Sequence, residues 1–204
     1  IKEQEGTKDT HSLTLGLARD TRDNFYNPTK GSRHVLTLEN AGGILGGDNT
    51  FYKVIGDTNW YFPLPWNTVF HLRGRAGIVE GYDEKDVPIY ERFYVGGINT
   101  IRGFEYGEAG PKDETGEVIG GEKMVVFNSE FIFPLSRAIG LRGAIFYDGG
   151  AGWDEKFERW RHAVGVGIRW FSPVGPIRID WGYNLDPQKG EKQGVWDFTA
   201  GAQF

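Results

Sequence analysis

A period of two in side-chain polarity constrains the fold of this chain more than any other feature of its sequence. Large apolar residues alternate with charged residues or glycine over residues 164–170, 177–183 and 196–204. Successive side chains of a β-strand point to opposite faces, so this alternation is typical of strands. About nine strands are expected, and no segment has the pattern of a helix. The expected strands are residues 12–19, 33–41, 50–62, 67–80, 123–133, 139–148, 162–171, 176–184 and 195–204.

The composition agrees with an all-β fold and argues against several classes of protein. The 204 residues include 31 glycines, 14 Phe, 9 Tyr and 7 Trp, which suits pleated strands joined by tight turns. The absence of cysteine excludes disulfides and thiol chemistry. The net charge of −5 argues against a nucleic-acid binder, whose binding face is basic. No apolar run reaches the roughly 18 residues of a membrane helix, whereas a membrane-spanning strand needs only about ten residues with every second one apolar.

The connections between the expected strands are of two kinds, which alternate along the chain. Short connections with proline occur at 63–65, 134–136 and 172–176, and longer glycine-rich ones at 42–49, 81–122, 149–161 and 185–194. In an up-and-down sheet, successive connections lie at opposite ends of the strands, so all short turns meet at one rim. This asymmetry is expected of outer-membrane barrels. Aromatic residues beside the short turns would form a girdle at one membrane interface: Trp60, Tyr61, Phe62, Trp66, Phe133, Trp170 and Phe171.

The alternation alone fits two folds, because it does not say which face of the sheet is buried. In a soluble barrel or sandwich the apolar face packs inward, whereas in a membrane barrel it contacts lipid and the polar face lines a lumen. The charged residues of the polar face are Arg73, Arg75, Glu130, Arg142, Asp148, Arg169, Arg178, Asp180 and Asp197. Trp196, Phe198 and the terminal Phe204 share the apolar face of the last strand. A last strand ending at a membrane interface would bury that terminal ring, which favours the membrane barrel.

The connection 81–122 is far longer than the roughly two to five residues of a usual hairpin loop. Its residues 90–104 are rich in aromatic and β-branched side chains, so we expect this segment to fold back against the protein, into the lumen. Arg102 would then be buried and would need carboxylate partners. Glu130 and Asp148 are the candidates on the inward face of the following strands. A solvated loop charge is the alternative interpretation of Arg102.

Residues 94–104 closely resemble the loop signature of the BamA-type outer-membrane assembly factors, the bacterial surface-antigen family. The core of that signature corresponds here to Ile101, Arg102, Gly103 and Phe104. Further similarity occurs in family order at residues 20–24, 27–31, 42–48, 129–131, 147–150, 172–176 and 204. The resemblance implies a sixteen-stranded antiparallel barrel preceded by periplasmic domains. Residues 1–204 would be its carboxyl-terminal portion, an up-and-down transmembrane β-barrel of about eight to nine strands with the loop 81–122 folded inward.

The resemblance also implies a function. Members of this family fold and insert β-barrel proteins into the bacterial outer membrane, and their signature arginine pairs with acidic residues of the barrel wall. Carried over, Arg102 would pair with Glu130 and Asp148. Family function is attributed to the seam between the first and last strands, here represented by Trp196, Phe198, Gly201 and Phe204. The implied partners are outer-membrane lipid, unfolded barrel-protein clients and, through periplasmic domains absent from this chain, assembly-machine lipoproteins.

An odd number of strands leaves open how such a portion closes. Unpaired strand edges in lipid are costly, so we expect either a closed eight-stranded arrangement or self-association of the chain. Residues 1–10 lack a basic-then-apolar leader, so either a signal has been removed or the chain is part of a longer protein. Because the first strand of the family barrel is absent, we expect little insertase activity from this portion alone.

No enzyme, metal or cofactor is expected. The histidines lack the spacing of metal ligands: His11, His34, His71 and His162. The glycines at 42–47 are not followed by the Lys-Ser/Thr pair of a phosphate-binding loop. The alternatives to an assembly factor are the barrel of a related two-partner secretion or protein-translocation pore, a passive pore and a soluble β-sandwich.

Overall fold

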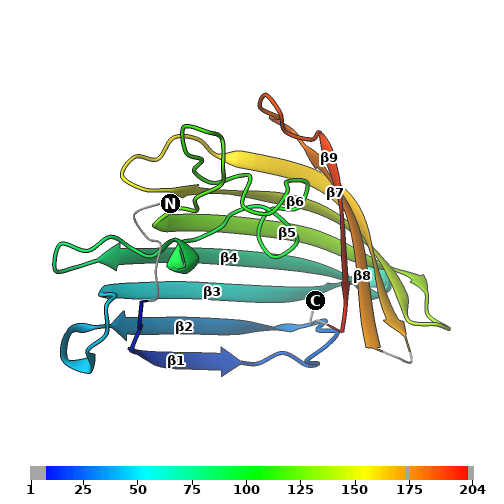
Figure 1. Ribbon diagram of the computed structural model, residues 1–204. Coiled ribbons are helices and arrows are strands. Elements are labelled where there is room, and N and C mark those ends of the chain that lie inside the picture. The colour runs from blue at the N-terminus through cyan, green and yellow to red at the C-terminus, as the bar shows by residue number, and fades with distance from the viewer. Residues whose placement is uncertain (1–7, 173–174, 202–204) are drawn as a thin grey trace.

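The structure is a computed structural model and describes residues 8–172 and 175–201. In these residues nine antiparallel strands form one sheet in the order β1 to β9, an up-and-down meander (Figure 1). The strands are β1 (Ser12–Asp20), β2 (Gly31–Ala41), β3 (Phe51–Leu64), β4 (Thr68–Gly81), β5 (Lys123–Ser136), β6 (Leu141–Trp153), β7 (Arg161–Ser172), β8 (Gly175–Asn184) and β9 (Gly194–Ala200). Short 3-10 helices lie in the connections: η2 (Gly43–Leu45), η3 (Pro65–Asn67) and η4 (Ile89–Glu91). No helix in the described ranges is long and apolar enough to cross a membrane. The all-β antiparallel architecture confirms the expected fold class.

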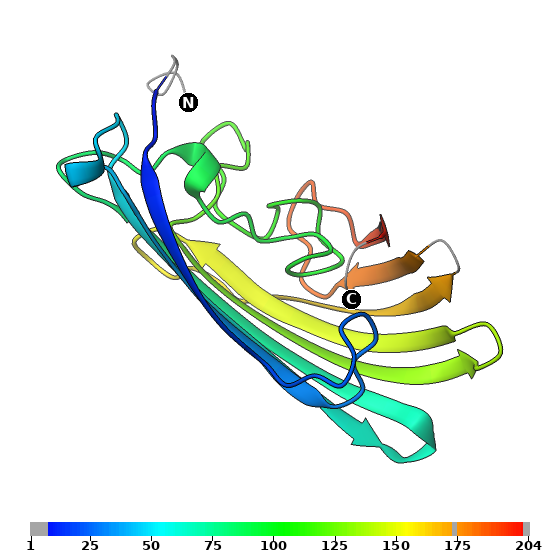
Figure 2. The same cartoon turned by 90° about the horizontal axis from the view of Figure 1, so that it is seen from below.

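The sheet curves into an open trough (Figure 2). Each described strand pairs only with its neighbours in the sequence, so β1 and β9 each keep one unpaired edge within this part of the chain. The expectation of a closed eight-stranded arrangement is therefore wrong. Closure by eight strands would require β8 to pair with β1, or β9 with β2, but β8 is paired on both edges by β7 and β9, and β2 on both edges by β1 and β3. The trough has a concave inner wall and a convex outer surface.

The observed strand boundaries differ from the expected ones mainly at proline and glycine. β3 continues through Pro63, and β5 continues through Pro134 with a shift in register after it. Proline lacks a backbone N–H, but near the end of a strand little pairing is lost. β6 reaches Trp153, beyond its expected end, because Gly149 and Gly150 pair with β5 instead of opening a loop.

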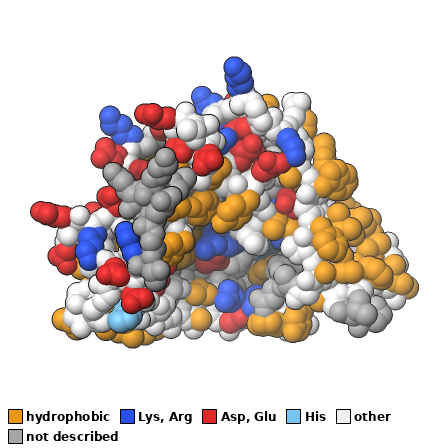
Figure 3. Space-filling view, in the orientation of Figure 1, with side chains coloured by type: hydrophobic (Ala, Val, Ile, Leu, Met, Phe, Trp, Pro, Cys, Tyr) orange, Lys and Arg blue, Asp and Glu red, His pale blue; other side chains and the backbone are white. Residues whose placement is uncertain are grey.

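The two faces of the sheet differ in polarity as the alternation predicts. On the convex surface Leu13, Ile145 and Phe198 are 68%, 54% and 64% exposed. On the inner wall the charged side chains of Asp148 and Asp180 are fully buried. Figure 3 shows acidic and basic side chains within the hollow and hydrophobic side chains along the right-hand flank, where β7 and β8 lie. The ionised groups therefore face the interior of the trough and the apolar groups face outward.

The main hydrophobic core lies on the concave side, between the sheet and the connection from β4 to β5. Its buried members come from the wall and from this connection: Ala41, Phe51, Val79, Val87, Phe93, Val95, Ile101, Phe104, Ala109, Met124, Val126 and Ala163. Burial of apolar surface is the dominant favourable contribution to folding. The burial of these side chains therefore holds the connection from β4 to β5 against the inner wall of the sheet.

The first turn departs from the rule of short turns at one rim. The connection from β1 to β2, residues 21–30, is ten residues long and rises over the concave face (Figure 2, dark blue). Arg142 of β6 donates a hydrogen bond to Asn27 Oδ1 in this turn, at 2.6 Å. A side chain from the far part of the wall thus fastens the turn over the trough.

Two members of the expected aromatic girdle point inward instead. Tyr61 is 6% exposed and stacks on His71, with ring centroids 4.4 Å apart. Phe171 lines a small inner cavity together with Tyr61. The expectation is wrong for these two residues because the alternation sends the neighbours of Trp60 and Trp170 to the opposite face.

Candidate functional site

The connection between β4 and β5, residues 82–122 and hereafter the inner loop, lies over the concave face. In Figures 1 and 2 it is the green segment that crosses the hollow side of the sheet. A bridge joins Phe93, in the first half of the inner loop, to Gly121 at its end. Ile101 and Phe104 in its middle have no exposed surface. The inner loop is thus packed against the wall and is not a solvated hairpin loop.

Arg102 is the most extensively paired side chain of the inner loop, and it is 2% exposed. Its Nε and Nη2 donate to the two carboxylate oxygens of Asp148 at 2.6 and 2.7 Å, and its backbone N–H donates to the same group at 3.0 Å. Its Nη1 donates to Glu130, and to Asp180 Oδ2 at 3.2 Å. Burial alone would lower the pKa of Arg102, but the charges of Glu130 and Asp148 outweigh it and raise the pKa well above its ordinary value.

Two further arginines of the wall complete a charge cluster around these carboxylates. Arg169 of β7 donates to Asp180 and, at 3.1 Å, to Glu130. Arg178 of β8 donates to Asp180 Oδ2 at 2.6 Å. Three arginines thereby face three carboxylates, the third being Asp148. Buried charges are tolerated when they are paired in this way, but removal of one partner leaves an uncompensated charge and costs about 3–5 kcal/mol.

The guanidinium of Arg102 also lies over an aromatic ring. Its Cζ is 3.5 Å from the centroid of the Phe146 ring on β6. A desolvated cation–π contact of this kind contributes about 2 kcal/mol. The ring needs a gap in the next strand, since a Cβ built on Gly165 of β7 would lie 2.3 Å from Phe146 Cζ. The absence of a side chain on Gly165 therefore leaves space for the Phe146 ring, which contacts the guanidinium of Arg102.

The inner loop approaches β8 backbone to backbone at the residue after Arg102. Gly103 has φ +85°, a conformation that residues with a Cβ rarely adopt. A Cβ on Gly182 of β8 would lie 2.3 Å from Gly103 N. Phe104 then inserts beneath Arg161, whose Cζ is 4.8 Å from its ring centroid. Arg102, Gly103 and Phe104 of the motif thus each have a contact with the wall, and Ile101 belongs to the main hydrophobic core.

The structure brings Arg102 together with Glu130 and Asp148, the two partners named from the sequence. Sequence reasoning placed Asp180 on the inward face without assigning it to Arg102, and it did not find Phe146. The available signal was the set of glycines at inward positions of β7 and β8, which includes Gly165 and opens space for neighbouring side chains.

The inner loop also contacts the connection from β8 to β9. Arg161 donates to both carboxylate oxygens of Glu191, at 3.1 and 2.5 Å, and Lys112 of the inner loop lies 3.5 Å from the same carboxylate. Lys192 pairs with Glu105 at 2.5 Å. Burial would raise the pKa of Glu191, but the hydrogen bonds from Arg161 and from the Gln188 backbone, together with the charges of Arg161 and Lys112, outweigh it and lower the pKa. The last connection is thereby fastened to the inner loop.

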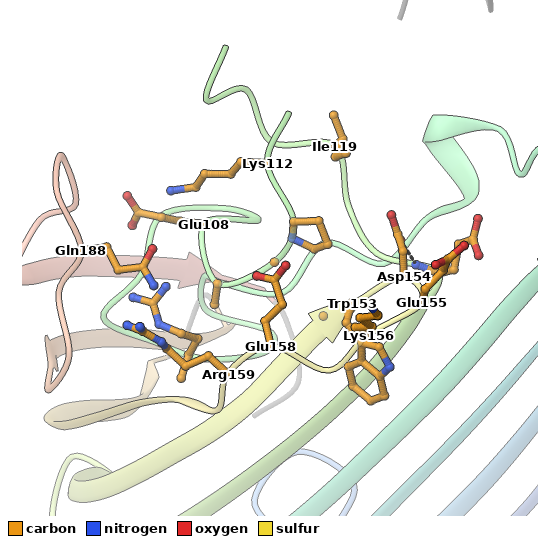
Figure 4. A pocket seen from close by; sticks show the side chains of 16 residues that line it. Glu108, Lys112, Ile119, Trp153, Asp154, Glu155, Lys156, Glu158, Arg159 and Gln188 are labelled. Atoms are coloured by element: carbon orange, nitrogen blue, oxygen red, sulfur yellow. Dashed lines mark hydrogen bonds between the residues drawn. The ribbon is translucent and has the colours of Figure 1, made fainter. Parts of the chain in front are cut away.

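A cavity of about 740 Å³ opens beside these contacts, between the inner loop and the connections that follow β6 and β8. In Figure 4 acidic and basic side chains such as Glu108, Glu158, Lys112 and Arg159 surround it. Among the described residues, no cluster of three or more His, Asp or Glu is placed to hold a metal ion.

The residues assigned to the terminal strand lie apart from the charge cluster around Arg102. Trp196 and Phe198 of β9 are 73% and 64% exposed on the convex surface. Gly201 follows β9 with φ +79° and donates to Pro176 O at 2.8 Å. Phe204 lies outside the described residues. The seam residues are therefore at the open edge of the trough, and the signature residues are on its inner wall.

Comparison with known proteins gives a consistent result. The model of the Omp85 superfamily domain matches residues 1–204. The chain is 37% identical, over 212 residues, to the outer membrane protein assembly factor BamA of Nitratidesulfovibrio vulgaris, covering 100% of this chain and 27% of that protein. It is 30% identical over 228 residues to BamA of Neisseria meningitidis, covering 94% and 28% of the two chains. The chain thus spans about a quarter of the length of these curated relatives.

Similarity extends to a eukaryotic protein and to a solved structure. The mouse sorting and assembly machinery component 50 homolog is 30% identical over 122 residues, 60% of this chain and 26% of that protein. The crystal structure of Haemophilus ducreyi BamA lacking POTRA domains 1–3 superposes with a TM-score of 0.80 at 25% identity. The match covers 92% of this chain and 42% of that one.

Proposed function

The chain belongs to the Omp85 superfamily, and from this premise we propose that it is the barrel portion of an assembly factor that folds and inserts β-barrel proteins into the bacterial outer membrane. It is an outer-membrane protein, as are its relatives named BamA. The inward charges and outward apolar side chains of the sheet support this proposal, because a membrane barrel needs a lipid-facing apolar surface.

The observation that carries the proposal is the burial of Arg102 among three carboxylates of the wall. This one side chain fastens the inner loop to β5, β6 and β8, through Glu130, Asp148 and Asp180. β8 in turn holds β9, whose other edge is unpaired in the described residues. The fastened loop braces the wall beside that edge and leaves the edge free for an incoming strand.

The proposed partners follow from this arrangement. Lipid covers the convex surface, where Trp196 and Phe198 are exposed. The clients are unfolded barrel proteins, which pair with a free strand edge through backbone hydrogen bonds. Assembly-machine lipoproteins would bind through periplasmic domains outside this chain. No catalytic role is proposed for the buried carboxylates, since Glu130, Asp148 and Asp180 are all held by arginine. The alternative of a secretion or translocation pore is not favoured, because the curated relatives described above are named as assembly factors.

The test is insertion of an unfolded barrel protein into liposomes by the full-length gene product. Arg102→Ala is expected to slow insertion about tenfold or more, because three wall carboxylates then lose their shared partner. Arg159→Ala is the matched control, since Arg159 is in a surface pair with 52% of its side chain exposed. Circular dichroism establishes that both variants are folded. Equal insertion rates for a folded Arg102→Ala protein and for the control would contradict the proposal.

A further inference from the structure

A second cavity, of about 220 Å³, lies on the concave face between the inner loop and the turn 21–30. Its lining differs from that of the cavity of about 740 Å³ because positive charge dominates. Asp57 and Glu130 are the acidic side chains among the described residues that line it. The basic ones are six arginines: Arg22, Arg33, Arg73, Arg102, Arg169 and Arg178.

The ion pairs around this cavity do not neutralise it. Asp20, Asp148 and Asp180 join the two lining carboxylates as partners of its arginines, and Arg75 lies 3.9 Å from Asp57. Asp197, which lies opposite Asp180 on β9, is a sixth carboxylate beside these groups and, like Arg75, is outside the lining. Seven arginines thus face six carboxylates, which leaves an excess of one positive charge. A cavity with concentrated charge of one sign attracts counter-ions of the other.

Several donors at this cavity have unused hydrogen-bonding capacity in the described structure. The contact of Arg33 with an acid is an ion pair with Asp20 at 3.9 Å, too long for a hydrogen bond. Arg178 uses Nε for Asp180, while its Nη2 lies 3.8 Å from Glu130. The Nε of the neighbouring Arg75 is buried without a partner. Guanidinium groups from three different strands therefore retain N–H groups for another acceptor.

The cavity also contains a buried acceptor without a donor. Asn128 is 6% exposed, and its Nδ2 donates to Thr100 O at 2.7 Å, which identifies the other amide atom as oxygen. This Oδ1 has no hydrogen-bond partner in the described structure. A buried, unpartnered acceptor is costly. A ligand that carries one hydroxyl beside its acidic oxygens would satisfy it.

We propose that this cavity is a binding site for a divalent oxyanion of the phosphate class. A hydrogen phosphate anion is attracted by the excess of positive charge, and arginine forks are suited to phosphate oxygens. Its single O–H can donate to Asn128. Once bound, the anion bridges β2 and β8 through Arg33 and Arg178, the lining arginines with unused N–H groups. The proposal does not depend on assembly activity, because binding is measured separately from insertion.

The test is calorimetric titration of the full-length gene product with inorganic phosphate, at fixed ionic strength and at a pH where the anion is divalent. One saturable site is expected, and sulfate, which lacks the hydroxyl, binds more weakly. Arg33→Gln weakens phosphate binding about tenfold, the effect of one lost charge-assisted hydrogen bond. Arg33→Lys keeps the charge and loses the fork, so its phosphate affinity is expected to lie between those of the parent protein and Arg33→Gln. This variant also covers the case in which Arg33→Gln does not fold.

Arg137→Gln is the matched control, because Arg137 lies exposed in the turn after β5 and the substitution removes the same charge. Glycerol phosphate is titrated beside inorganic phosphate to distinguish an esterified group from the free anion. Binding of either, lost in Arg33→Gln and kept in Arg137→Gln, supports the proposal. Absence of saturable binding of both, or equal binding by the two variants, overturns it.

Discussion

Replacement of Asp148 by asparagine tests the buried cluster most sharply, because it changes charge with almost no change in shape. Asp148 is fully buried and accepts three hydrogen bonds from Arg102, at 2.6, 2.7 and 3.0 Å. The introduced amide keeps one acceptor oxygen and turns an NH₂ group toward the donors. Three arginines of the cluster then face two carboxylates. The expected loss in the free energy of unfolding is about 3–5 kcal/mol, the cost of breaking a buried pair.

The assay is denaturant unfolding of the full-length gene product in detergent, followed by tryptophan fluorescence. Asp186→Asn is the matched control, since Asp186 pairs with Arg159 while the two side chains are 44% and 52% exposed. Such a surface pair contributes about 0–1 kcal/mol. In a double-mutant cycle, Arg102→Gln combined with Asp148→Asn is expected to cost about 1–3 kcal/mol less than the sum of the single changes. A loss below about 1 kcal/mol for Asp148→Asn, or strict additivity in the cycle, would refute the reasoning.

Two further predictions concern the contacts on either side of the cluster. Gly182→Ala places a Cβ 2.3 Å from Gly103 N and is expected to cost about 1–3 kcal/mol in the same unfolding assay, whereas Gly16→Ala, with no atom within 4 Å, changes stability by less than about 0.5 kcal/mol. Equal effects of the two alanines would argue against the close approach of loop and strand. The contact of Glu191 with Arg161 is expected to persist above the ordinary pKa of glutamate and to be lost as the pH falls, because the folded-state pKa is lowered. The hydrogen-exchange protection factors of residues 185–193, corrected for the intrinsic pH dependence of amide exchange, should therefore fall on acidification in the parent protein, and they should not do so in Glu191→Gln.

The period of two was sufficient to predict the strands and the polarity of each face. It assigns Asp148 and Asp180 to the inner wall, because a strand has only two faces. It does not show how far a side chain leans toward the next strand. Asp180 reaches Arg169 and Arg102 over Gly167, where a Cβ would lie 1.8 Å from its carboxylate. The contacts of Asp180 with Arg169 and Arg102 therefore depend on the curvature of the sheet and on glycine, which has no Cβ, at position 167.

The errors in the sequence-based expectations have two causes, one local and one set by the topology of the sheet. Tyr61 joins Trp60 in the expected girdle because the two are adjacent in the sequence, although adjacent strand residues face opposite sides. The turn 21–30 looks like an ordinary polar loop, and its position over the trough depends on Arg142, more than a hundred residues away. Contacts at such separation come from the topology of the sheet and have no local signal. The unpaired edges of β1 and β9 likewise follow from the linear strand order.

We expect the convex surface of the sheet to meet lipid and the concave surface to face a polar interior. This chain contains no cysteine, so a single introduced thiol can be labelled selectively within it. Leu38→Cys and Thr37→Cys place a fluorescent label on adjacent residues of β2 that face opposite sides. In the full-length gene product in liposomes, we expect a lipid-soluble quencher to reach the label at position 38 and a water-soluble quencher to reach the one at 37. The reverse pattern, or equal access of the water-soluble quencher to both labels, would contradict the account.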